Sequence, residues 1–288
     1  MNDLNYVEFK KQRDLGALIS DTVKFLRIEG KPFFITIIRA SIIPMIIAIA
    51  GALYYTFTVA ESSYLNSGNL FSSGNILLSL LGYYGTLILV NASISNSALS
   101  YIKSYAFNRG VINYEDIQET TKSKFGSVLG LSFLNAIVMA VGFMFCFLPG
   151  IYFAVVLSVS TSILMFNNLG VFDAFGDAFN FIKGNWWETF GVLLVAGLII
   201  IVLNIILNLP AMIYQFGTDG FNFFTIENTV SATELFSDPV FLILTVLSYL
   251  INYFFHAVGV VLSALIYFDI EEQRNPSAPD IIDEIGGV

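Results

Sequence analysis

Charged residues are scarce in this 288-residue chain. Asp, Glu, Lys and Arg make up only 12% of the sequence, whereas hydrophobic residues make up 56% and the mean hydropathy is +0.75. A soluble domain carries roughly 25% charged residues because water must wet its surface, so this composition excludes an ordinary soluble protein. The apolar residues form runs of about 20 or more, which is the length needed to cross a bilayer. We therefore predict an integral membrane protein.

Cysteine, histidine and basic stretches are also scarce. The single cysteine, Cys146, lies inside an apolar run, which excludes a disulfide framework and a thiolate metal site. The 13 basic residues form no stretch beyond 10–13, so we expect no nucleic-acid partner. Nucleophile elbows, phosphate-binding glycine loops and zinc-protease motifs are absent from the sequence. We therefore predict a protein that is not an enzyme and has no cofactor, and we keep a membrane enzyme only as a third class.

The apolar runs predict an all-α, polytopic membrane protein with six transmembrane helices. These crossings are expected at about 33–58, 75–101, 125–147, 150–169, 186–209 and 240–267. Pro149 and Gly150 are expected to form a tight turn between the third and fourth crossings. The crossings belong to a single transmembrane domain over 14–270, between a polar, poorly ordered segment 1–13 and an acidic tail 271–288.

Two or three shorter helices are predicted to lie in the membrane interface. From residue 14 an apolar stripe recurs with helical spacing until Gly30, Lys31 and Pro32 end it, and residues 172–183 repeat the arrangement. In the second stretch Phe172, Phe175, Phe179 and Ile182 share one face. A short helix starting at 113 is a third candidate. A helix with one apolar stripe that is too short to cross the bilayer is typical of an interfacial helix.

The positions of lysine and arginine predict the orientation. Six crossings place both termini on one side of the membrane, and every basic residue except Arg39 then falls on that side. Because basic loops remain in the cytoplasm, this side is predicted to be cytoplasmic, and the membrane to be a bacterial inner membrane.

The crossings also suggest an internal repeat. The second, fourth and sixth crossings end in similar sequences, which can be aligned with one another at 97–101, 162–166 and 263–267. The unit of interfacial helix, crossing, outer turn and crossing would then occur three times, at about 14–105, 111–170 and 171–270. Repeats of this kind usually enclose a site or an interface near their shared axis.

Six residues form a candidate polar site within the membrane: Arg39, Asn91, Ser95, Asn96, Ser160 and His256. Arg39 could extend to the cytoplasmic headgroups or could contact a buried anion. The serine and asparagine residues of the second and fourth crossings either pack helices together or line a cavity for a solute or lipid. His256, the single histidine, is either a hydrogen-bonded core residue or a proton relay. Asn135, Asn204 and Asn208 are interpreted as packing contacts.

Several short motifs carry a family resemblance. They lie at Leu148–Tyr152, Gly170–Phe175, Phe181–Trp187 and Ala264–Asp269. With these motifs the chain resembles a broad, poorly characterised group of bacterial six-helix inner-membrane proteins. That group is similar to the membrane region fused to some glycerophosphodiester phosphodiesterases, and to YciC-like proteins. The resemblance implies an architecture. It implies no activity, because the soluble phosphodiesterase barrel and its metal ligands are missing.

These observations lead to one preferred function and one alternative. The preferred function is a non-catalytic interaction or lipid-organising component, with the lipid bilayer as one partner and a protein at the cytoplasmic face as another. The alternative is a transporter or channel for a small solute or lipid, which would use the polar surface of the second and fourth crossings and Arg39.

Overall fold

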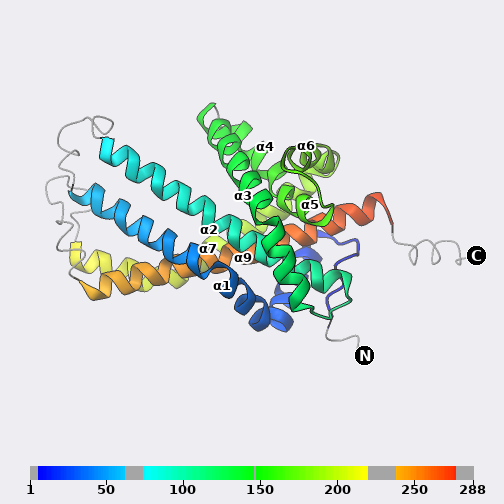
Figure 1. Ribbon diagram of the computed structural model, residues 1–288, viewed down its shortest axis with the longest axis horizontal. Coiled ribbons are helices and arrows are strands. Elements are labelled where there is room, and N and C mark those ends of the chain that lie inside the picture. Colours follow the sequence, from blue (N-terminus) through cyan, green and yellow to red (C-terminus); the bar gives the residue numbers. More distant parts are fainter. Residues whose placement is uncertain (1–5, 62–73, 146, 220–237, 277–288) are drawn as a thin grey trace, which may run out of the picture. The chain divides into compact units, whose positions relative to one another are not determined.

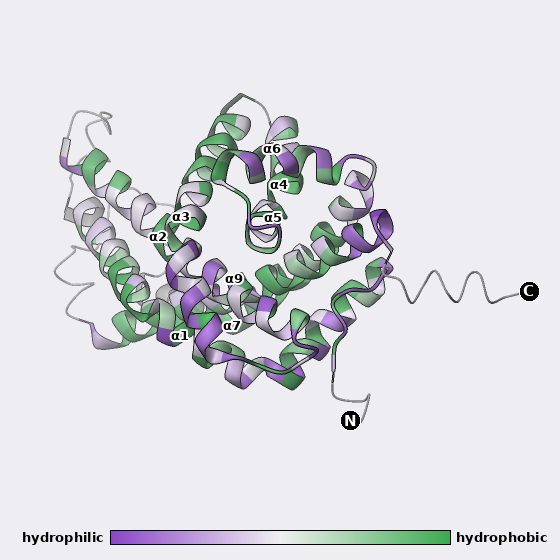
Figure 2. Ribbon diagram, turned by 45° about the vertical axis from the view of Figure 1, so that its right-hand side comes forward, coloured by the Kyte–Doolittle hydropathy of each residue, from purple (hydrophilic) through white to green (hydrophobic). Residues whose placement is uncertain are grey.

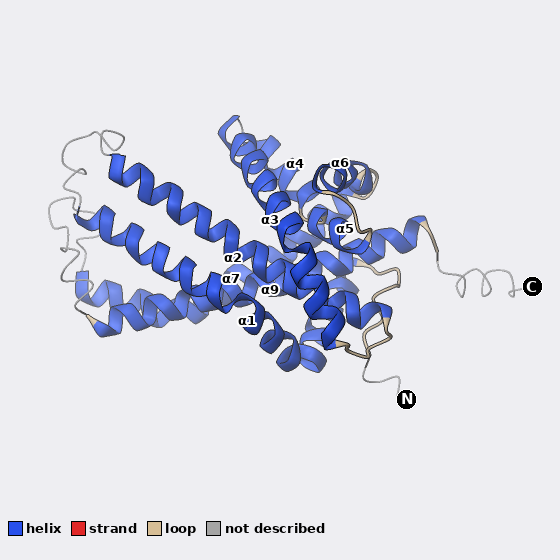
Figure 3. Cartoon of the chain, in the orientation of Figure 1, coloured by secondary structure: helices blue, strands red, loops and turns tan. Residues whose placement is uncertain are grey.

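The computed structural model describes residues 6–61, 74–145, 147–219 and 238–276, and these residues form helices and connecting loops without a strand (Figure 3). The helices, labelled in Figure 1, are α1 (Leu15–Glu61), α2 (Gly74–Phe107), α3 (Tyr114–Phe145), α4 (Phe147–Leu157), α5 (Ser160–Phe166), α6 (Val171–Ile182), α7 (Trp186–Asp219) and α9 (Pro239–Arg274). The described residues contain six helical spans that are long and apolar enough to cross a membrane. The prediction of an all-α, six-crossing membrane protein is therefore confirmed.

The chain forms two compact units whose boundaries fall inside the long helices. Unit 1 comprises 1–41, 92–197 and 256–288, and unit 2 comprises 42–91 and 198–255. The single transmembrane domain over 14–270 stays a prediction. Hydrophobic residues occupy most turns of the helices in both units (Figure 2).

The second half of α2 is the core of unit 1. From Ala92 to Ala106 every residue is buried except Lys103, which is half-buried. A helix that is buried on all sides is surrounded by other parts of the protein. The side chains of Ile94, Leu99 and Ile102 have almost no exposed surface. The other elements of unit 1 are therefore placed by their contacts with this segment.

The helix boundaries differ from the predicted ones at the proline residues. α1 continues through Pro32, so the predicted interfacial helix and first crossing are one helix, and the expected end at Gly30–Pro32 is wrong. Proline cannot donate the backbone hydrogen bond of an α-helix. The fully buried rings of Phe25 and Phe33 nevertheless contact each other edge to face. They hold the helix segments before and after Pro32 in the core. α7 likewise continues through Pro210.

The third and fourth crossings also depart from expectation. The helix predicted from 113 is the first part of α3, and Pro149 and Gly150 lie within α4 instead of in a turn before it. The fourth crossing is interrupted after Leu157, and α5 begins at Ser160. The Ser263 hydroxyl donates to the carbonyl of Ser158 at 2.6 Å, which provides a partner for the backbone where the helix is broken.

The N-terminal segment is packed against unit 1. Phe9 is 0% exposed, and its ring contacts those of Phe25, Tyr105 and Phe268 edge to face. The backbone N–H of Val7 donates to the Tyr105 hydroxyl at 3.0 Å. The expectation of a poorly ordered segment is therefore wrong for residues 6–13. At the other end α9 continues to Arg274, and most of the predicted acidic tail lies outside the described residues.

Helix α6 forms as a separate element close to the predicted range 172–183. Ala174, Ala178 and Ile182 are buried, whereas Asp173 is exposed and Phe172 is 79% exposed. The location of α6 in the membrane interface and the threefold repeat remain predictions. Most of the two segments predicted between crossings on the outer side, 61–75 and 211–238, lies outside the described residues, although α7 continues into the second of them as far as Asp219.

Unit 2 contains parts of α1, α2, α7 and α9, and it exposes many large apolar side chains. The most exposed include Ile43, Ile46, Leu78, Leu81, Ile213 and Ile243. In a membrane protein such a surface faces lipid. Inside the unit the rings of Tyr55 and Tyr83 stack with centroids 5.3 Å apart.

Candidate functional site

Four of the six predicted site residues lie in the interior of unit 1 and join helices there. Ser95 on α2 and His256 on α9 are hydrogen-bonded, with 3.1 Å between Oγ and Nε2. Asn96 is fully buried, and its side-chain N–H donates to the Thr121 carbonyl of α3 at 2.7 Å. Ser160 accepts a hydrogen bond of 2.8 Å from the Asn135 side chain of α3. These residues therefore lie at helix contacts.

A serine cluster that the prediction recognised only in part extends this pattern. Ser93 on α2 donates to the Ser41 hydroxyl of α1 at 3.0 Å, and the Ser41 and Ser97 hydroxyl oxygens are 3.4 Å apart. Ser41 was not predicted as a site residue, although a small polar residue inside an apolar run was an available signal. Another serine pair joins α5 to α9, where the hydroxyls of Ser162 and Ser263 are 3.1 Å apart. Such contacts hold membrane helices together.

The other two predicted site residues, Arg39 and Asn91, differ from these four in exposure or in the unit to which they belong. Arg39 is exposed on α1, and no hydrogen bond or ion pair of its side chain is found among the described residues. Asn91 belongs to unit 2 and is half-buried there. The polar site predicted from the six residues stays a prediction.

A cavity of about 310 Å³ in unit 1 lies elsewhere, between the starts of α1 and α7 and the end of α9. Its polar lining includes Asp14, Asn185, Glu188, Thr189, Asp269 and Gln273, and its apolar lining includes Leu15, Leu18, Val192, Ile266 and Ile270. Asn185 and Asp269 come from two of the motifs that carry the family resemblance. The structure thus brings together residues whose proximity the sequence could not reveal.

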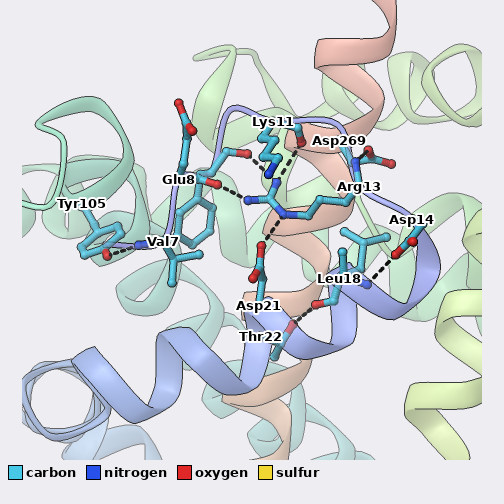
Figure 4. A network of polar contacts seen from close by, with 12 residues as sticks. Val7, Glu8, Lys11, Arg13, Asp14, Leu18, Asp21, Thr22, Tyr105 and Asp269 are labelled. Carbon is cyan, nitrogen blue, oxygen red and sulfur yellow. Dashed lines mark hydrogen bonds and ion pairs between the residues drawn. The ribbon is translucent and has the colours of Figure 1, made fainter. Parts of the chain in front are cut away.

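Arg13 is one of the residues that line this cavity, and Figure 4 shows its polar contacts within the N-terminal segment. Its backbone N–H donates to Asp269 Oδ1 at 2.6 Å, while its guanidinium points away from Asp269. The guanidinium, which is 1% exposed, forms an ion pair of 2.9 Å with Asp21 and donates to the carbonyls of Glu8, Phe9 and Lys11. The positive charge of Arg13 is therefore satisfied outside the cavity. Nearby, burial raises the pKa of the Tyr6 hydroxyl above its usual value, and Glu8 acts in the same direction.

Unit 2 contains a second cavity, of about 270 Å³, between α7 and α9. Hydroxyl and amide groups of Tyr214, Thr245, Ser248, Tyr249 and Asn252 line it together with Ala211, Phe241 and Leu244, so the lining has no charge. Asn204 donates to Asn252 at 3.1 Å, in agreement with the packing contact predicted for Asn204. Asp238 directly precedes α9, and its carboxylate accepts a hydrogen bond from the Tyr214 hydroxyl of α7. This bond lowers the pKa of the Asp238 carboxyl.

The described residues contain no group of three side chains able to hold a metal ion. Comparisons with protein-family models, curated proteins and solved structures gave no match. The described residues therefore form a helical protein suited to span a membrane, with a hydrogen-bonded core and a cavity of about 310 Å³ in unit 1 and a cavity of about 270 Å³ in unit 2.

Proposed function

We propose that the protein is a non-catalytic component of a bacterial inner membrane, with both termini in the cytoplasm, that organises lipids or interacts with a protein partner. One observation carries this proposal. The serine and asparagine groups that could have lined a solute path in unit 1 are engaged in hydrogen bonds between buried helices. Unit 1 is therefore best understood as a scaffold.

The charge distribution supports the lipid-organising part of the proposal. Lys10, Lys11, Lys24, Arg27 and Lys31 are all exposed in unit 1. On the predicted cytoplasmic side, such residues attract anionic lipid headgroups, with about 1 kcal/mol per basic residue near the surface. The cavity of unit 1 is lined in part by Asp14, Leu15 and Leu18, which are near these basic residues in the sequence.

An alanine series tests the scaffold interpretation. Ser95→Ala, Asn96→Ala and Ser160→Ala each remove one side of an interhelical hydrogen bond, so each should lower the stability of detergent-purified protein by roughly 1 kcal/mol. Ser123→Ala is the control, because among the described residues the hydroxyl of this exposed residue bonds to the carbonyl of Thr120 within its own helix and to no other helix. If the three variants melted like the wild type, the scaffold interpretation would be wrong.

Transport of a small uncharged solute or lipid is the second candidate function, and the uncharged cavity of unit 2 favours it. Glycerol uptake into proteoliposomes is the direct measurement. Ser248→Ala with Asn252→Ala should then slow uptake, while Ser123→Ala should not. Uptake at the rate of protein-free vesicles would exclude glycerol-like solutes and leave the first function standing.

A further inference from the structure

The lining of the cavity in unit 1 includes a hydroxyl group, that of Thr189, with no hydrogen-bond partner among the described residues. Thr189 is 3% exposed and lines the cavity, yet no hydrogen bond of its hydroxyl is found among the described residues. Threonine residues in helices commonly donate to the carbonyl four positions earlier. Thr22, Thr36 and Thr56 of this chain do so at 2.8–2.9 Å. A hydroxyl that lines a cavity without a protein partner is available to accept or donate a hydrogen bond to a bound group.

The charge around the cavity is negative. Asp14, Glu188 and Asp269 line it, and Asp269 is only 5% exposed. The one basic lining residue, Arg13, directs its guanidinium to Asp21 and to backbone carbonyls. The starts of α1 and α7 each contribute roughly half a positive charge, which is too little to balance three carboxylates. The cavity therefore favours a cation over an anion.

The carboxylates retain the capacity to accept further hydrogen bonds. Asp269 accepts from the Arg13 backbone and from the Gln273 side chain, one bond at each oxygen. Asp14 accepts from the backbone N–H of Ala17 at the start of α1. Each carboxylate has about four acceptor positions, so these contacts leave room for an external donor.

The size and the apolar side of the cavity restrict the cation. About 310 Å³ is at the small end of the range for ligand pockets. Leu18, Val192 and Ile266 present an apolar surface beside the carboxylates. A ligand that matches both surfaces has a compact charged head with hydrogen-bond donors and a short methylene stem.

We propose that this cavity binds a primary ammonium group on a short alkyl stem. The three N–H donors of the ammonium would pair with carboxylate oxygens and with the Thr189 hydroxyl, and the stem would lie against the apolar wall. The ammonium could belong to phosphatidylethanolamine or to free ethanolamine. In its lipid form the proposal rests on the proposed lipid-organising function.

Two conservative substitutions remove charge while they retain the fold. Asp14→Asn keeps a good N-cap, because asparagine caps helices as well as aspartate does. Glu188→Gln retains the shape of an exposed side chain in the first turn of α7. The control pair is Glu119→Gln with Asp177→Asn, two exposed carboxylates of unit 1 that do not line the cavity.

Native mass spectrometry of the full chain provides the test. The protein is offered equal amounts of phosphatidylethanolamine and phosphatidylglycerol, and lipid-free protein is titrated with ethanolamine in a separate calorimetric experiment. The proposal expects at least tenfold preference for the ethanolamine lipid or measurable ethanolamine binding. It also expects a loss of tenfold or more in the Asp14→Asn, Glu188→Gln double variant, with no change in the control pair.

The two sources of the ammonium have different outcomes. Lipid binding supports both the ammonium site and the lipid-organising function, whereas binding of ethanolamine alone supports the site and argues against that function. Equal retention of both lipids without ethanolamine binding would overturn the proposal. A preference for phosphatidylglycerol, or a double variant that binds as the wild type does, would overturn it as well.

Discussion

At the scale of single residues, partners on other helices decide what each polar side chain does. Ser95, Asn96 and Ser160 look alike in the sequence as candidates for packing or for a cavity, and the structure pairs them with His256, Thr121 and Asn135. The sequence shows which groups are polar within an apolar run, but it does not show which groups meet. For the same reason the proximity of Asp14, Glu188 and Asp269 could not be predicted.

Phe9 gives a residue-scale prediction for the N-terminal segment. Phe9→Ala removes a ring with 0% exposure that three other aromatic rings contact, so it should lower the free energy of unfolding by about 3 kcal/mol. Phe172→Ala is the matched control, because Phe172 is 79% exposed. Thermal unfolding in detergent measures both. Equal melting temperatures for the two variants would show that residues 6–13 do not contribute to the stability of unit 1.

At the scale of elements, hydropathy predicted the helices far better than their ends. Six apolar runs identified six crossings because each run must satisfy its backbone inside the bilayer as a helix. Local signals at the ends were less reliable. Pro32 did not end α1, since the aromatic contacts around Phe33 hold the helix there, and the break after Leu157 has no proline to mark it.

The contact between α3 and α4 gives an element-scale prediction. A Cβ added to Gly142 would lie 2.7 Å from Phe153 Cδ2 and 3.3 Å from the Cα of Gly150, so Gly142→Ala must displace the Phe153 ring and crowd the backbone of α4. We expect a loss of roughly 1–3 kcal/mol, which is typical of overpacking. Gly126→Ala on the same helix meets no atom within 4 Å and should be neutral or slightly stabilising. Thermal unfolding distinguishes them, and equal behaviour would disprove close packing at Gly142.

At the scale of the whole molecule, both described ends of the chain lie within unit 1. The Gln12 side chain donates to the Glu272 carbonyl at 3.1 Å, and the Arg13 backbone donates to Asp269. Contacts between the N-terminal segment and the end of α9 require both to be on the same side of the membrane. A chain that crosses the membrane an even number of times has both ends on the same side, and the six helical spans agree with this requirement. The cytoplasmic identity of that side remains a prediction from the basic residues.

The proposed functions depend on the six-crossing topology. The most direct test of this topology is the labelling of introduced cysteines. In a Cys146→Ser background, Gly68→Cys and Asn228→Cys should react with a membrane-impermeant maleimide in intact cells. Asn108→Cys and Asn275→Cys should react only after the membrane is opened. Labelling of position 68 or 228 only from the cytoplasmic side, or of position 275 from outside, would contradict the topology and place the ammonium cavity away from the cytoplasmic headgroups.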